Sequence, residues 1–187
     1  MYTTIIATDI VGYARQARTE DLQSVLRARA YQQLAAAFAM TQIPWDQCQT
    51  EDRGDGALII VPATVDCDYC LDPLVHHLAV ALRRYNRHAS EATRLRLRLA
   101  IHFGHVQRDS RGVSGHAATH LFRLIEASAF KRALRNVGTD LGVLISDQLH
   151  NEAIQRGGMF NPSAYQPIRV SIKETRCTAW LWLAPRA

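Results

Sequence analysis

Apolar positions follow two different spacings along this chain, and each change of spacing marks an expected element. Short apolar runs bounded by polar or glycine-rich segments predict buried strands, whereas apolar residues repeating every three or four positions predict helices. The expected strands span residues 3–8, 46–51, 57–61, 94–101, 141–145, 168–172 and 177–183. The expected helices start at Thr19 and Pro73 and span residues 115–135 and 147–155.

One strand pattern is unusually regular. Residues 94–101 read Arg-Leu-Arg-Leu-Arg-Leu-Ala-Ile, which predicts a strand with a buried leucine face and an arginine face that we expect to be solvated. Residues 53–56, Arg-Gly-Asp-Gly, have the composition of a tight hairpin turn. Strands alternating with helices, with hairpins at two points, predict a mixed, mainly antiparallel sheet covered by helices, an α/β (α+β) fold.

Length and composition favour one domain. The chain has 187 residues, of which 48% are apolar, so we expect residues 1–187 to form a single core. No apolar run approaches the roughly 20 residues of a membrane helix, and the N-terminus lacks the pattern of a signal peptide. We therefore expect a cytoplasmic protein with no membrane partner.

The charge and the cysteines add two further expectations. The net charge of +5 comes from dispersed basic residues, which argues against a nucleic-acid partner and fits a triphosphate substrate. Cys67 and Cys70 form a C-x-x-C, but Cys48 and Cys177 supply no second pair for a zinc ribbon. We expect reduced, structural thiols.

Two aspartates stand where apolar strand patterns meet turns. Asp9 follows residues 3–8, and Asp55 precedes residues 57–61. A carboxylate at the tip of a buried strand loses solvation, which is costly unless a cation compensates it. The pair therefore predicts a divalent-metal site.

Four segments, in this order, resemble the catalytic domain of class III nucleotidyl cyclases over nearly the full chain. Residues 8–13, Thr-Asp-Ile-Val-Gly-Tyr, are similar to the first metal motif of that family, and residues 53–56 to its metal-bearing hairpin. Residues 99–106 resemble the strand before the dimer-arm loop, and residues 112–124 the loop and helix that carry the transition-state residues. The resemblance implies a ferredoxin-like core and the conversion of a ribonucleoside triphosphate into a 3′,5′-cyclic mononucleotide.

The resemblance also implies a metal and phosphate site. Asp9 and Asp55, with the Ile10 carbonyl, would hold two Mn²⁺ or Mg²⁺ ions, which activate the attacking 3′-hydroxyl and neutralise the triphosphate. Gly12 and Tyr13, entering the first helix, would offer backbone N–H groups to the β- and γ-phosphates.

The same resemblance assigns roles to further residues. Arg123 would stabilise charge on the α-phosphate, for which a guanidinium fork is well suited. Thr119 stands where the family orients the ribose, and Lys173 or Arg176 would contact the triphosphate. The family builds its site across a head-to-tail homodimer, so aspartates of one chain would meet Thr119 and Arg123 of the other.

Departures from the family pattern concern the base. Glu51 stands where adenylyl cyclases have lysine and guanylyl cyclases have glutamate, and Gly112 stands where purine cyclases have a base-reading aspartate or equivalent polar residue. Thr119 replaces the asparagine that usually orients the ribose, and His116 replaces a residue that is commonly asparagine. Such a pocket resembles the pyrimidine cyclases of bacterial antiphage (Pycsar) systems, which make cyclic UMP or cyclic CMP for a separate effector. Two alternatives stay open: a purine cyclase with an unusual base pocket, and a degenerate cyclase-like module that binds nucleotide without turnover.

Overall fold

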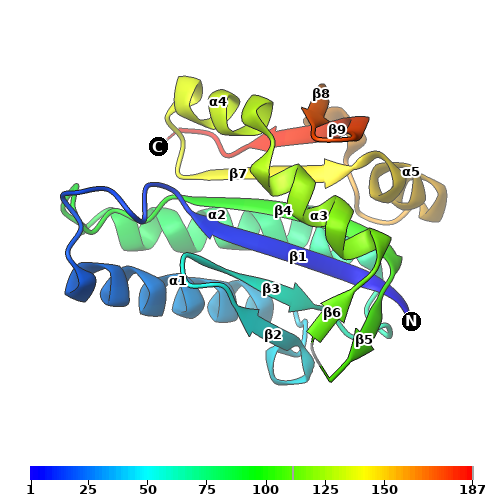
Figure 1. Ribbon diagram of the computed structural model, residues 1–187, viewed down its shortest axis with the longest axis horizontal. Helices are drawn as coiled ribbons and strands as arrows, with labels where there is room; N and C mark the ends of the chain where they lie inside the picture. The colour runs from blue at the N-terminus through cyan, green and yellow to red at the C-terminus, as the bar shows by residue number, and fades with distance from the viewer. Residues whose placement is uncertain (111, 187) are drawn as a thin grey trace.

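A computed structural model describes residues 1–110 and 112–186 of the chain. Its centre is a seven-stranded sheet in the order β2-β3-β1-β4-β7-β9-β8 (Figure 1). The parallel pair is β4–β7, and the other neighbours run antiparallel. The expected mixed, mainly antiparallel sheet is confirmed. Its strands are β1 (Tyr2–Ile10), β2 (Gln49–Asp52), β3 (Gly56–Ile60), β4 (Leu97–His105), β7 (Leu141–Ser146), β8 (Gln166–Ile172) and β9 (Thr175–Leu183).

Helices cover both faces of this sheet (Figure 1). One face is covered by α1 (Glu20–Met40) and α2 (Asp72–Asn86), and the other by α3 (His116–Glu126) and α4 (Ser128–Val137). The remaining helix, α5 (Asp147–Arg156), follows β7 and contributes to the core on the α1 and α2 side. Three short 3₁₀ turns span Trp45–Gln47, Cys67–Cys70 and Pro162–Ala164. No helix within the described ranges is both long and apolar enough to cross a bilayer.

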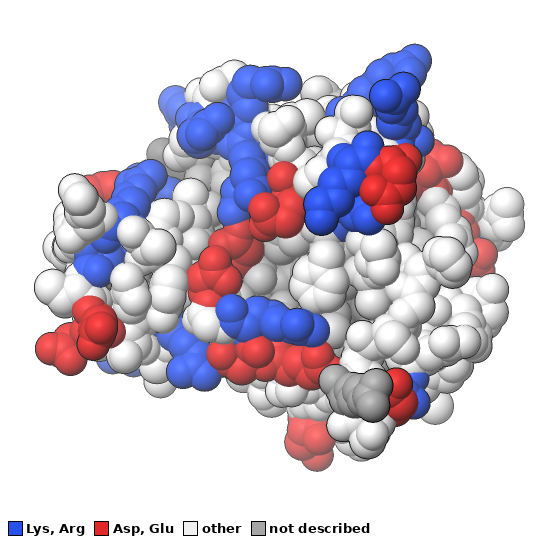
Figure 2. All heavy atoms as spheres, viewed as in Figure 1, with Lys and Arg blue, Asp and Glu red and all other residues white. Residues whose placement is uncertain are grey.

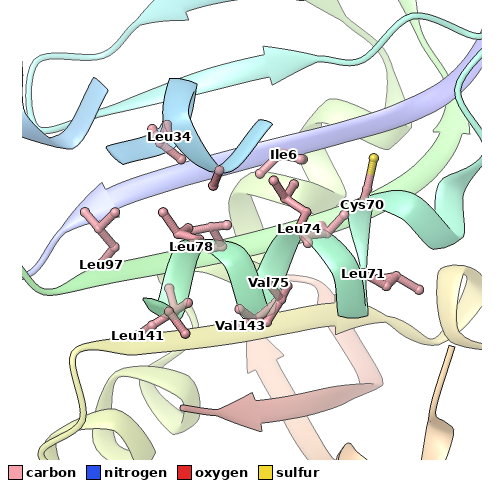
Figure 3. Close-up of a cluster of buried hydrophobic side chains, with 14 of the residues drawn as sticks. Ile6, Leu34, Cys70, Leu71, Leu74, Val75, Leu78, Leu97, Leu141 and Val143 are labelled. Atoms are coloured by element: carbon pink, nitrogen blue, oxygen red, sulfur yellow. The ribbon is translucent and has the colours of Figure 1, made fainter. Parts of the chain in front are cut away.

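Two core clusters result from the alternation of side chains along the strands. In β1, Ile6 and Ile10 face α1 and α2, whereas Ile5 and Ala7 face α3 and α4. Figure 3 shows the first cluster, in which side chains of α2 meet those of the sheet. The predicted leucine face of β4 belongs to it and is buried, as expected.

The expected helix over residues 115–135 is wrong as a single element, because the chain breaks at Ala127. That residue is extended (φ −57°, ψ 124°), so α3 ends and α4 starts in a new direction. The break lets α4 pack closely on β7: a Cβ on Gly142 would lie 2.8 Å from Leu134 Cδ1 and 3.1 Å from Phe130 Cε2. Because both halves have helical periodicity and the junction has no glycine or proline, sequence periodicity alone does not reveal the break.

Other boundaries also differ from the expectation. Trp45–Gln47 is a 3₁₀ turn rather than the start of the second strand. The strand expected at 94–101 occupies Leu97–His105, because the Leu95 backbone is bonded on both sides by the Asn86 side chain. A small separate hairpin, β5 (Gln107–Asp109) and β6 (Gly112–Ser114), was not predicted.

The cysteines are free thiols, as expected. Burial raises the pKa of Cys48 and of Cys67 to about 11, so both thiols stay protonated near neutral pH.

Candidate active site

The backbones of β1 and β3 bring the two predicted metal aspartates to neighbouring strand ends. Asp9 is in register with Gly56, and the Ile10 N–H donates to the Asp55 carbonyl oxygen at 2.8 Å. This approach depends on glycine, because a Cβ on Gly56 would collide with the Thr8 carbonyl oxygen. The local geometry therefore holds the two aspartates next to each other.

The two carboxylates have different environments. Asp9 forms an ion pair with Arg98 of β4, and each of these side chains is only 13% exposed. Asp55 is exposed, and its carboxylate has no ion pair or hydrogen bond with any residue that the structure describes. Burial, and to a lesser degree the charge of Arg135, lower the pKa of Arg98. Asp9 thus carries a compensating cation within the chain, and Asp55 does not.

The predicted solvated arginine face is wrong. Arg94 forms a bidentate ion pair with Asp140, with both N–O distances at 2.9 Å. Arg96 lies 3.3 Å from Glu91 and 3.6 Å from Asp140. Arg98, as described, pairs with Asp9. The pairing carboxylates come from other strands and loops, so strand periodicity alone does not predict them.

The donor set at the aspartates suits a hard divalent cation. Within residues 1–110 and 112–186, no group of three or more His, Cys, Asp or Glu side chains is arranged to hold a metal ion. Asp9, Asp55 and the Ile10 carbonyl nevertheless provide oxygen ligands. Mg²⁺ commonly takes one or two carboxylates together with waters and substrate phosphates rather than a complete protein cage. The residues present therefore fit an ion that is held jointly with a triphosphate.

Gly12 and Tyr13 do not enter a helix, contrary to the expectation. They lie in a turn, and α1 starts only at Glu20, where the Thr19 side chain caps it. The Tyr13 side chain packs against the core cluster on the α1 and α2 side, and its N–H is directed to the Ile10 carbonyl oxygen at 3.3 Å. Gly12 has a φ of 69°, and a Cβ there would collide with the Arg15 side chain. A phosphate contact in this turn would not draw on a helix dipole.

Thr119 and Arg123 line a cavity of about 730 Å³ on the α3 side of the sheet. They are four residues apart on α3 and therefore on one face of it. The Arg123 side chain is 14% exposed, and it donates to Thr175 Oγ1 at 2.8 Å and to Glu174 Oε1 at 2.6 Å. These two hydrogen bonds hold its guanidinium in one orientation, so it is not a free surface group.

Lys173 and Arg176 do not line this cavity. Nor do they line the pocket beside Asp9, which has a volume of about 340 Å³ and is formed in part by Gly12, Arg98 and Lys131. Both are exposed, and Lys173 occupies the turn between β8 and β9 with a φ of 51°. Glu174 and Thr175 of the same turn are the residues that reach the cavity. The structure of one chain therefore does not bring either predicted phosphate cation to these two cavities.

The same cavity also contains His102, which is buried, and His120, which is half-buried, and the sequence did not assign either to the site. His102 Nδ1 lies 2.8 Å from Ser146 Oγ, and the His102 and His120 rings are 5.1 Å apart. Burial, and secondarily the proximity of His120, lower the pKa of His102 to about 4, so it is neutral near pH 7. Helix α3 approaches closely because Gly104 lacks a Cβ, which would lie 3.2 Å from the Cβ of Ala117.

The two predicted base-reading positions lie close together. A Cβ on Gly112 would be 3.2 Å from Glu51 Oε1. The Glu51 carboxylate already accepts from Arg53 at 2.8 Å, and the Arg53 guanidinium lies 5.1 Å from the centre of the Phe122 ring. His116 is exposed and lines the 730 Å³ cavity, and it does not belong to the group formed by Glu51, Arg53 and Gly112.

The aspartate end and the arginine end of the candidate site are separate within one chain. The pocket beside Asp9 and the cavity that contains Arg123 have no lining residue in common among those that the structure describes. Asp9 and Asp55 line neither of the two, so the predicted metal residues and Arg123 lie apart within one chain.

Comparison with known proteins identifies the fold. No protein-family model matches the sequence, and a search of curated proteins finds no significant match. In all, 104 chains of solved structures match. One is an adenylate/guanylate cyclase/hydrolase from Silicibacter pomeroyi, with a TM-score of 0.68 and 17% identity, covering 99% of this chain and 98% of that one.

Two fungal structures are also similar. The guanylate cyclase domain of RhGC from Catenaria anguillulae, in complex with GTP, has a TM-score of 0.62 and 16% identity, covering 100% of this chain and 97% of that one. A dimeric guanylyl cyclase domain of RhoGC from Blastocladiella emersonii has a TM-score of 0.62 and 13% identity, covering 97% and 96%. The chain therefore has the fold of class III cyclase catalytic domains.

Proposed function

We propose that this chain is a class III nucleotidyl cyclase that acts as a head-to-tail homodimer. The observation that carries the proposal is the separation of two complementary half-sites, with Asp9 and Asp55 at one and Thr119 and Arg123 at the other. Two-fold pairing would place each half-site of one chain against the opposite half-site of its partner, giving two sites per dimer. The guanylyl cyclase domain from Blastocladiella emersonii, whose structure is that of a non-canonical dimer, supports dimer formation by this fold but not the head-to-tail pairing itself.

The reaction proposed is an intramolecular phosphoryl transfer. The 3′-oxygen of the substrate bonds to the α-phosphorus, the bond to the bridging oxygen breaks, and pyrophosphate leaves. Mn²⁺ or Mg²⁺ ions, when bound, would favour deprotonation of the 3′-hydroxyl and offset the charge of the triphosphate. Asp9, Asp55 and the Ile10 carbonyl would hold them.

The residues of the opposite half-site would position the substrate. Arg123, oriented by Glu174 and Thr175, would direct its guanidinium to the α-phosphate oxygens, where negative charge builds up. The exposed Thr119 hydroxyl, on the same helix face, would orient the ribose. Because these groups come from the partner, a monomer should be inactive.

We extend the proposal to UTP or CTP as the preferred substrate. Gly112 offers no side-chain contact to a base, and an aspartate there would lie against Glu51, with like charges facing each other. The Glu51 carboxylate is also engaged by Arg53, which reduces its capacity to accept from guanine. These two features support a pocket without the purine readers, which a smaller pyrimidine would suit.

The test is to incubate purified protein with each of the four ribonucleoside triphosphates and Mn²⁺ and to identify the products by mass spectrometry. We expect cyclic UMP or cyclic CMP from the wild-type chain and none from Asp55→Ala at unchanged secondary structure. Cyclic GMP or cyclic AMP as the main product would refute the pyrimidine preference. The absence of any cyclic nucleotide would refute the enzyme and favour a regulatory module.

We propose further that the product is a second messenger for a separate effector in antiphage defence, on the strength of the resemblance to pyrimidine cyclases of such systems. Plaque counts on bacteria that express the chain with its neighbouring genes should fall relative to the Asp55→Ala variant. Equal plaque counts across a phage panel, with cyclic nucleotide detected in the cells, would exclude this role.

A further inference from the structure

A basic pocket of about 340 Å³ lies beside Asp9, on the α3 and α4 side of the sheet. It is bounded by the turn after β1, the start of β4 and helix α4. Five of its ten lining residues are Lys or Arg and none is Asp or Glu: Arg15, Arg96, Arg98, Lys131 and Arg135. Figure 2, in the same view as Figure 1, shows Lys and Arg side chains gathered in the upper left, where α4 lies.

The chain compensates these five cations incompletely. Arg98 pairs with Asp9, and Arg96 pairs with Glu91 and Asp140. Lys131 Nζ lies 2.5 Å from Glu126, whose side chain is 55% exposed and therefore a weak partner. Arg15 and Arg135 form no ion pair with any of the described residues. An excess of positive charge remains around the pocket.

Two further observations indicate that the pocket is built for an anion. The Nε atom of Arg98 is buried without a hydrogen-bond acceptor among the described residues, whereas the Arg96 Nε lies 3.6 Å from Asp140 Oδ1. Burial lowers the pKa of Arg18, and the charges of Arg15 and Arg96 lower it further, in keeping with an excess of positive charge in this region. Arg18 in turn donates to the Val11 carbonyl oxygen at 3.1 Å and so supports the turn that forms one wall.

We propose that this pocket binds the terminal phosphates of the substrate, and that Lys131 and Arg135 of α4 are their principal side-chain partners. This inference rests on the proposed function and assigns the triphosphate cations to the chain that also supplies Asp9. Neither Lys173 nor Arg176, the cations expected from the family pattern, is among the described residues that line this pocket or the 730 Å³ cavity.

The break at Ala127 explains how α4 reaches the pocket. Lys131 and Arg135 are four residues apart, so both project from one face of α4, which the break directs toward the start of β4. Leu134, between them in the sequence, packs on Gly142 and anchors the helix to the sheet. An extended polyphosphate beginning near Asp9 would meet both charges along the pocket.

The test compares two variants of the same helix. Arg132 is exposed, lies on α4 and does not line the pocket, so Arg132→Ala is a matched control for the double variant Lys131→Ala/Arg135→Ala. The probe is inorganic tripolyphosphate, measured by titration calorimetry on the full chain at low ionic strength. Loss of two charge-assisted contacts should weaken binding at least tenfold in the double variant and less than threefold in Arg132→Ala.

Kinetics with the preferred triphosphate supply a second readout. The KM of the double variant should rise at least tenfold while kcat changes less than threefold, because contacts to the terminal phosphates act in the ground state and the transition state alike. The pair Lys131→Arg/Arg135→Lys, which keeps both charges, should restore most of the binding and so separate a charge effect from a folding defect.

The outcomes distinguish this inference from the proposed function. Wild-type tripolyphosphate affinity in the double variant, or an equal loss in Arg132→Ala, would overturn the inference even if cyclic nucleotide forms. Binding of tripolyphosphate that depends on Lys131 and Arg135, without any cyclic product, would support the pocket and refute the cyclase.

Discussion

The two aspartates should differ in their contribution to stability, although both are expected to be essential for activity. Asp9→Ala leaves Arg98 largely buried with its direct partner removed, and unpairing one member of a buried ion pair costs about 3–5 kcal/mol. Since each side chain is 13% exposed and Arg98 lines an open pocket, we expect a loss somewhat below this range, about 2–3 kcal/mol. Asp55→Ala removes an exposed carboxylate and should change the free energy of unfolding by less than about 0.5 kcal/mol.

The assay is urea unfolding followed by tryptophan fluorescence, with EDTA and without nucleotide, so that no bound ligand contributes. For a chain of this size, the loss in Asp9→Ala corresponds to a decrease of roughly 5–10 °C in the unfolding temperature. The double variant Asp9→Ala/Arg98→Met should recover most of the stability, because no unpaired charge remains, with a coupling energy of about 2 kcal/mol.

Two results would refute this reasoning. Asp9→Ala with wild-type stability would show that the ion pair contributes nothing to the fold. Additive losses in the double variant would show that Asp9 and Arg98 act independently.

Three further predictions follow from the site. Arg123→Ala should lower kcat about 100-fold with little change in the unfolding temperature, since its partner Glu174 is solvent-exposed. A large decrease in the unfolding temperature would instead show that Arg123 has a structural role. Because the folded-state pKa of His102 is about 4 and its ordinary value 6.5, the unfolded chain binds more protons between these values, so stability should fall by about 2 kcal/mol from pH 7.5 to pH 5. His102→Gln should remove most of that dependence in unfolding titrations, and an unchanged slope would contradict the assignment. Gly112→Asp should destabilise the chain and lower activity on every triphosphate, because the residue has a φ of 119° and its Cβ would lie 3.2 Å from Glu51; gain of guanylyl cyclase activity would show instead that the pocket accepts a purine reader.

Local patterns were sufficient for the main elements. Thr19 caps α1 as the pattern of a polar cap followed by acidic residues predicts, with its Oγ1 accepting from the Leu22 N–H at 3.4 Å. The glycine-rich turn at Asp55 and the leucine face of β4 were also predicted, because turn composition and side-chain alternation depend on residues close in sequence. The placement of Asp9 and Asp55 at neighbouring strand ends belongs to the same class of inference.

Long-range contacts decided the rest. Alternation placed Arg98 on the right face of its strand but did not show that β1 lies beside β4, which is what makes Asp9 its partner. Periodicity placed Lys131 on a helix but did not show the break at Ala127, which is a response to close packing on Gly142.

The sequence by itself predicted most of the elements, proposed Asp9 and Asp55 as metal ligands, and placed Arg123 on a helix, because each of these depends on local spacing and residue chemistry. Only the tertiary structure decided that Asp9 and Asp55 lie apart from the cavity that contains Arg123, and that five cations line a pocket whose Arg98 pairs with Asp9. The physical reason is that charge compensation and cavities arise between strands and helices distant in sequence. Their partners are set by strand order and by the direction of each helix.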